Sequence, residues 1–214
     1  MSHRWMVGCA LALGSLLVAS VGCLHTPDRV KPPAIDAAAA GAEAIKMYDT
    51  NKDGKISGEE LDKCPAIKAA LAQIDPSGKG EVTADMITAR IRKWQETKVG
   101  KMPLSCTVTR NGQPLEGATV TLVPEKFLGS EIKPATGTTT ANGMAMLSIA
   151  IDTSSTGQRE SGGVAPGLYR VVITKQGMDI PAKYSAEAST VLGVEAAQDT
   201  ARNRMGGIKF DLNF

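Results

Sequence analysis

The sequence predicts a multidomain α + β protein, with a helical module over residues 37–100 followed by an antiparallel, seven-stranded β-sandwich over residues 101–214. Up to Trp94, apolar residues recur three and four positions apart, which is the spacing of a buried helix face. After Pro103, apolar and polar residues alternate in short segments. Asn-Gly, Pro-Gly and Ser/Gly-rich turn sequences separate these segments, which is typical of a sandwich.

The composition is that of a globular chain. Of the 214 residues, 43% are hydrophobic and 21% are charged. Aromatic residues make up only 4%, so any core depends on Ala, Val, Ile, Leu and Met. The net charge is +2 and no run of Lys or Arg forms a basic stripe, so we expect no nucleic-acid partner.

The N-terminus has the pattern of a secretion signal over residues 1–22. Arg4 precedes an apolar stretch over 5–19 that is too short to span a bilayer, which needs roughly 20 apolar residues. Ser20-Val21-Gly22-Cys23 follows and resembles the lipobox of bacterial lipoproteins, except that Ser20 stands where those proteins most often have Leu. The resemblance implies lipidation of Cys23 and a membrane anchor in the cell envelope, periplasmic or on the cell surface. The alternative is ordinary cleavage after Gly22, which would leave a soluble exported protein.

A linker over residues 23–36 connects this anchor to the first helix. Pro27, Pro32 and Pro33 lie in it without apolar periodicity, so we expect residues 24–35 to be extended and solvated. Asp36 is a good N-cap for the Ala-rich segment that follows it.

Residues 49–60 read D-T-N-K-D-G-K-I-S-G-E-E, the full D-x-[DN]-x-[DN]-G-x5-E pattern of an EF-hand calcium loop. Calcium is a hard cation that prefers oxygen ligands, and Gly54 permits the bend that folds the loop around it. Lys55 can offer only its backbone carbonyl, Ser57 can bind directly or through water, and Glu60 can offer both carboxylate oxygens. The expected metal ligands are Asp49, Asn51, Asp53, Lys55, Ser57 and Glu60. The alternative is a polar turn that matches the EF-hand pattern by chance.

Residues 75–86 resemble a second, degenerate EF-hand loop. Asp75, Gly80 and Val82 occupy the expected places, but Lys79 stands at a ligand position and Met86 replaces the bidentate Glu. We therefore expect residues 37–100 to form an EF-hand pair with one Ca²⁺ site, in which Ile56 lies opposite Val82. Affinity should be modest, about 10⁻⁴–10⁻³ M, as in extracellular modules, and the ion should hold the helix pair together.

The seven predicted strands cover 104–110, 118–123, 135–140, 144–149, 168–175, 191–196 and 207–214. Gly112–Leu122 (G-Q-P-L-E-G-A-T-V-T-L) and Pro166–Val171 (P-G-L-Y-R-V) resemble carboxypeptidase-regulatory-like or transthyretin-like β-sandwich domains. The likeness covers about residues 104–214. Together with the calcium module, it resembles a group of exported bacterial lipoproteins and implies a structural, adhesion or scaffolding role, with no catalytic residues carried over.

Two other classes of function remain open. A binding module would hold a peptide, glycan or envelope protein on the sandwich, with calcium only structural. An enzyme would have to be a carboxylate-based hydrolase, for example through Asp152 and Asp179, because His3 and His25 lie in or near the signal. We expect no enzyme. Cys64 and Cys106 could form a disulfide in an exported protein or lie buried separately.

Overall fold

The computed structural model describes residues 31–150, 162–203 and 207–214. The predicted signal, Cys23, the first part of the linker and Asp152 lie outside the described residues. Within these ranges no helix has both the length and the apolar character needed to cross a bilayer.

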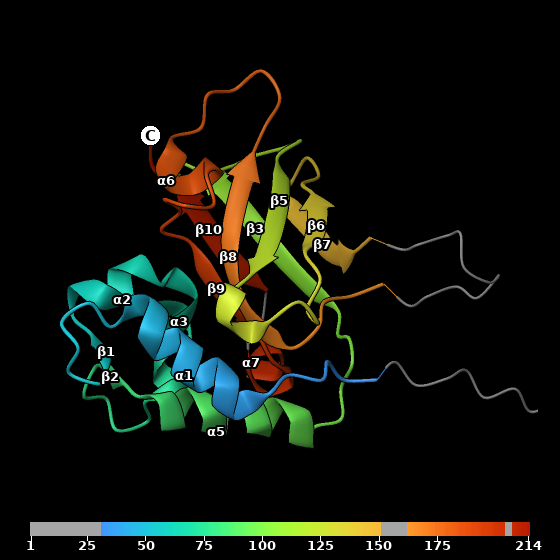
Figure 1. Ribbon diagram of the computed structural model, residues 1–214. Helices are drawn as coiled ribbons and strands as arrows, with labels where there is room; N and C mark the ends of the chain where they lie inside the picture. Colours follow the sequence, from blue (N-terminus) through green and yellow to red (C-terminus); the bar gives the residue numbers. More distant parts are fainter. Residues whose placement is uncertain (1–30, 151–161, 204–206) are drawn as a thin grey trace, which may run out of the picture.

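The N-terminal part of the fold is helical, as predicted. It contains α1 (Ala37–Tyr48), β1 (Ile56–Ser57), α2 (Glu59–Lys63), α3 (Pro65–Ala69), α4 (Leu71–Ile74), β2 (Glu81–Val82) and α5 (Ala84–Glu96). Asp36 caps α1 by accepting the N–H groups of Ala38 and Ala39. Helices α1 and α5 pack side by side (Figure 1), and they approach closely at Gly41, where a Cβ would overlap the carbonyl oxygen of Ala84.

Two local predictions for this part need correction. Proline is favourable in a first helical turn, so Pro65 and the apolar stripe after it predict one helix through Ile74, but the structure divides it at Ala70 into α3 and α4. The end of the linker is not solvated, because Ile35 is buried in the core and its carbonyl accepts a 2.7 Å hydrogen bond from Gln95 Nε2 on α5. Burial of this apolar side chain favours contact between the end of the linker and the helical part.

All seven predicted strands are present, and an eighth short strand joins them. They are β3 (Leu104–Arg110), β4 (Gln113–Pro114), β5 (Thr119–Pro124), β6 (Ala135–Thr138), β7 (Met144–Ile149), β8 (Gly167–Thr174), β9 (Gly193–Ala196) and β10 (Ile208–Leu212). Short helices η1 (Lys126–Leu128), α6 (Ala182–Ser185) and α7 (Gln198–Asn203) lie in the connections. Strand β4 pairs with β3 across the predicted turn at Asn111-Gly112, where both residues have positive φ.

The β-part is sandwich-like, but one curled sheet forms it, in the order β10-β3-β7-β6-β5-β8-β9. Strand β7 turns the corner, because its residues 144–147 pair with β3 and its residues 148–149 pair with β6. The prediction of a wholly antiparallel sheet is wrong at one edge, since β10 runs parallel to β3. No tight turn joins these two strands, so their relative direction is not restricted to antiparallel.

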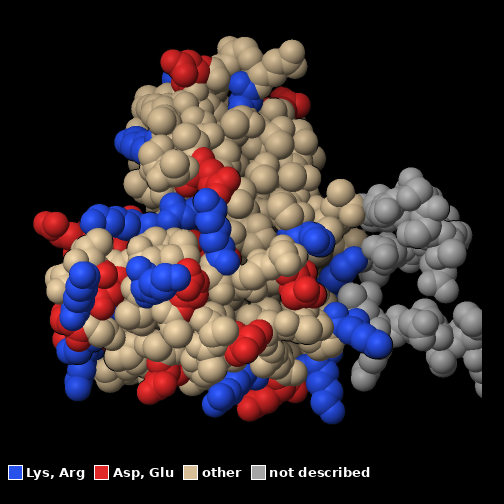
Figure 2. Space-filling view, viewed as in Figure 1, with Lys and Arg blue, Asp and Glu red and all other residues tan. Residues whose placement is uncertain are grey.

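The core is continuous between the helical part and the sheet. Strand β10 alternates as predicted, with Ile208, Phe210 and Leu212 buried and the residues between them exposed. Strand β9 is buried on both faces because α3 and α5 cover the face that points away from the sheet interior. Charged side chains of both signs are interspersed over the helical part, with fewer on the visible face of the β-part (Figure 2).

Candidate metal centre

The predicted calcium loop connects α1 to α2 and is folded tightly by its own hydrogen bonds. Asp49 Oδ1 accepts the N–H groups of Lys52 and Asp53 at 2.6 and 3.2 Å, and its Oδ2 accepts the N–H of Gly54 at 2.9 Å. Gly54 has a φ of 84°, so this bend requires the freedom of glycine. The first predicted ligand is thus placed at the centre of the bend.

Asn51 and Asp53 lie next to each other in the same loop. Asn51 Nδ2 donates to Asp53 Oδ2 at 3.1 Å, and Asn51 Oδ1 accepts the N–H of Asp53 at 2.9 Å. Asp53 Oδ1 accepts the N–H of Lys55 at 3.0 Å. Both side chains are exposed, which leaves their oxygens accessible to a solvated cation.

Glu60 closes the loop by reaching from α2 back to its beginning. Its carboxylate Oε1 accepts the N–H and hydroxyl of Thr50 at 2.8 and 3.0 Å and the N–H of Asn51 at 3.2 Å. Its Oε2 accepts the N–H of Ser57 at 3.1 Å, as in one half of a capping box. These donors, Ser57 first, lower the pKa of Glu60 to about 2, so it is ionised at neutral pH.

The other two predicted ligands are positioned by the short β1–β2 pairing. Ile56 pairs with Val82, as predicted, and both are fully buried. Lys55 Nζ extends across this pairing to Glu81 at 2.7 Å, which raises the lysine pKa and keeps its charge on the second loop. Ser57 donates its N–H to Glu60 Oε2.

The second loop is closed by its own side chains. Asp75 is buried; its Oδ1 accepts the N–H and hydroxyl of Ser77 and its Oδ2 accepts the N–H of Gly80. These bonds, the Ser77 hydroxyl first, lower the pKa of Asp75. Met86, at the place of the bidentate Glu, is partly buried and packs against the core, and Lys79 is exposed. The absence of a metal site in the second loop stays a prediction.

The donor set of the first loop suits a hard cation, but its oxygens are already engaged. Within the described ranges, no three His, Cys, Asp or Glu side chains gather as a metal-binding group. Each carboxylate oxygen has about two lone-pair sites; Oε1 of Glu60 accepts three hydrogen bonds within the chain, whereas Oε2 accepts one and retains a site. Asp49 accepts three hydrogen bonds and retains one site. Bidentate coordination by Glu60 would therefore require it to give up some of these bonds.

A buried polar cluster, not foreseen from the sequence, ties both flanks of the first loop to the sheet. Tyr48, the residue before Asp49, donates to Glu125 Oε2 at 2.7 Å. Arg170 on β8 donates to the Tyr48 hydroxyl at 3.0 Å and to the carbonyl of Lys63, at the end of α2, at 2.6 Å. Its Nε lies 3.3 Å from Glu125 Oε1. Burial raises the pKa of Glu125, and Arg170 opposes that shift.

A second buried cluster joins α5 to β9 and α7. Arg90 Nε and Trp94 Nε1 both donate to Glu195 Oε1, and the other two Arg90 nitrogens reach Asp199 at 2.8 and 2.9 Å. The bond from Arg90 lowers the pKa of Asp199 to about 2. The sequence signals were an arginine on the apolar face of α5 and a glutamate within an apolar strand, each of which needs a partner when buried.

The two cysteines and Asp179, which the sequence also singled out, lie apart from the first loop. Cys64 and Cys106 are free and buried, one between α2 and α3 and the other on β3, so they are not bridged. Burial raises their thiol pKa values to about 12 and about 11. Asp179 is exposed in the connection after β8.

Comparison with known proteins assigns neither a family nor a function to the chain. No family model matches the chain, and no curated protein or solved structure is similar enough to match it. Its function must therefore be inferred from the chain's own residues.

Proposed function

We propose that residues 49–60 bind one Ca²⁺ as the first loop of an EF-hand pair, and that the ion stabilises the fold. Asp49, Asn51 and Asp53 supply side-chain oxygens, Lys55 its carbonyl, Ser57 an oxygen or a bridging water, and Glu60 its carboxylate. The observation that carries the proposal is the position of Glu60. Its ionised carboxylate crosses the loop to the N–H groups at residues 50 and 51, where it can close a ring of oxygens.

A structural role for the ion is favoured over a sensor role. A sensor must swing its helices apart to expose an apolar groove. Here Arg170 on β8 bonds both the Tyr48 hydroxyl of α1 and the Lys63 carbonyl of α2, and the apolar face of α5 belongs to the common core. Opening the helix pair would break these contacts.

The decisive experiment is a calcium titration of the mature chain by calorimetry. We expect one site per chain, with a dissociation constant of about 10⁻⁴–10⁻³ M. Glu60→Gln should abolish the heat of binding. Glu59→Gln is the matched control, because Glu59 is the exposed neighbour on α2 and loses the same charge. Two equivalent sites, or unchanged binding in Glu60→Gln, would overturn the assignment.

For the whole protein, we propose an exported lipoprotein held on a membrane by lipidated Cys23, with a structural, adhesion or scaffolding role. The sequence of residues 1–23 supports this location, and the resemblance of residues 104–214 to carboxypeptidase-regulatory-like domains supports the role. Mass spectrometry of the N-terminus tests the anchor. A diacylglyceryl group on Cys23 is expected, whereas an unmodified Cys23 would indicate a soluble exported protein.

Hydrolysis by a carboxylate pair remains the weaker proposal. The buried acids Glu125 and Glu195 are each held by an arginine, and Asp179 is an exposed loop residue. A hydrolase would need acids that face a substrate cavity with perturbed pKa values.

A further inference from the structure

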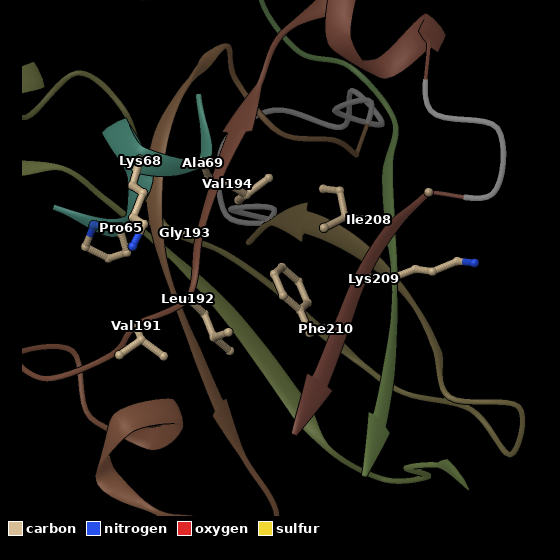
Figure 3. Close-up of a pocket in the computed structure, with 11 residues that line it drawn as sticks. Pro65, Lys68, Ala69, Val191, Leu192, Gly193, Val194, Ile208, Lys209 and Phe210 are labelled. Atoms are coloured by element: carbon tan, nitrogen blue, oxygen red, sulfur yellow. The ribbon is translucent and has the colours of Figure 1, made fainter. Parts of the chain in front are cut away.

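The curled sheet ends in two strands that border the same opening. Within the described residues, β9 pairs only with β8 and β10 pairs only with β3, so each of these strands has one unpaired edge. Residues 191–194 and 207–210 line the two sides of the opening, and α3 borders it (Figure 3). Its volume is about 530 Å³, within the range of sites that bind small molecules or peptides.

Backbone groups of both strands point toward this opening. The N–H of Val171 on β8 donates to the carbonyl of Leu192, so the next residue, Gly193, directs its N–H and C=O to the opposite edge. Similarly, the N–H of Asn111 donates to the carbonyl of Leu212, so Leu212 faces β3. Backbone groups alternate along a strand, and Lys209 and Asp211 therefore direct their N–H and C=O groups away from β3. These are the groups that an added strand would pair with.

The directions of the two strands also suit an added strand. Five antiparallel pairings lead from β3 to β9, so β9 runs opposite to β3 and therefore opposite to β10. A strand in the opening would thus run antiparallel to one neighbour and parallel to the other. Both ladders are ordinary ones.

Side chains around the opening separate into an apolar inner face and a cationic outer face. Val194, Ile208 and Phe210 point inward and are at most 8% exposed, while Lys209 points outward from β10 (Figure 3). Lys68 borders the opening from α3, and the lining contains no acidic residue. Lys68 also pairs with Asp62, but both side chains of that pair are more than half exposed, so the pair is weak and can be exchanged.

We propose that this opening binds an extended peptide segment of a partner protein, with apolar residues facing Val194, Ile208 and Phe210 and acidic residues facing Lys68 and Lys209. The added segment would extend the sheet through main-chain hydrogen bonds, while the alternating side chains would give specificity. Four residues line each side, so at about 3.3 Å per residue the segment makes contact over about 13 Å. This interaction does not depend on calcium.

The test uses the full mature chain and a capped hexapeptide that alternates valine and glutamate. Binding is followed by calorimetry, and amide hydrogen exchange locates it. We expect slower exchange at Gly193 and Lys209 when the peptide is present. Lys209→Glu should weaken binding roughly tenfold, because it places like charges on neighbouring strands. Lys46→Glu is the matched control, since it makes the same charge change on the exposed face of α1 and should leave binding unchanged.

Several results would overturn the proposal. Equal binding of a peptide with lysine in place of glutamate would show that charge has no part in recognition. Protection at amides outside the two edges would place the peptide elsewhere. Absence of binding at millimolar peptide would show that the edges do not accept a strand. Dimerisation of the chain through β9 and β10 without peptide would show that a second copy occupies the opening instead.

Discussion

Replacing Arg90 with methionine should destabilise the fold by about 3–5 kcal/mol, which is the usual cost of removing one partner from a buried ion pair. The side chains of Arg90 and Glu195 are 2% and 1% exposed, so water cannot replace the lost partner. Methionine retains most of the apolar stem of arginine, which limits the change to charge and hydrogen bonds. Glu195 would keep only the 2.9 Å bond from Trp94 Nε1, since its Oε2 already lacks a partner.

Urea unfolding followed by tryptophan fluorescence measures this loss directly. Trp94 is the single tryptophan after residue 22, so a chain without residues 1–22 reports on it alone, and it lies in the same cluster. For a chain of this size, the expected loss corresponds to a fall in Tm of about 6–20 °C. Arg92→Met, at the exposed neighbour on α5, is the matched control and should cost less than about 0.5 kcal/mol.

A double variant tests the physical reason for the loss. If the cost of Arg90→Met comes from an uncompensated carboxylate, adding Glu195→Gln should recover more than half of it. The glutamine still accepts from Trp94 but carries no charge. A single-variant loss below about 1 kcal/mol, or a double variant no more stable than Arg90→Met, would refute this reasoning.

Three further outcomes follow from the same structure. Ile56→Ala should cost about 2–5 kcal/mol in urea unfolding, because a fully buried side chain between the two loops is lost; a cost below 1 kcal/mol would contradict its place in the core. The folded pKa of Asp199 is depressed to about 2, so the stability from its contact with Arg90 should be complete above about pH 4 and lost as pH falls toward 2; Asp199→Asn should flatten this part of the pH profile. In a chain without residues 1–23, which removes Cys9 and Cys23, Cys64 and Cys106 should react with a thiol reagent only after unfolding, and rapid labelling of the native chain would show that they are accessible.

Short-range patterns in the sequence predict most of the local structure. The loop motif places Ile56 and Val82 at equivalent positions, and the structure pairs them. The alternation of Ile208, Phe210 and Leu212 predicts the buried face of β10, because side chains alternate across a strand whatever its partner is. These features depend on neighbours within a few residues, and so periodicity and turn chemistry identify them.

Features that depend on distant partners could not be predicted in this way. The alternation of β10 is the same beside a parallel or an antiparallel neighbour, so the sequence does not give its pairing with β3. Tyr48 meets Glu125 and Arg170 across more than seventy residues of chain. The sequence shows only that Glu125 follows an apolar strand and that Arg170 interrupts one. The sequence indicates that these charges need partners if they are buried, but it does not identify the partner residues.

The placement of Glu60 connects the loop, its expected affinity and the rest of the fold. To coordinate an ion with both oxygens, Glu60 must release hydrogen bonds that Oε1 accepts from Thr50 or Asn51, so part of the coordination energy is offset. A modest affinity would follow, and it would suit the proposed export, because calcium is plentiful outside the cell. Movement of Glu60 would also shift the start of α2, whose last carbonyl is bonded to Arg170 on the sheet. Calcium binding at residues 49–60 would therefore act on the helical part and the sheet together, which is what a structural ion requires.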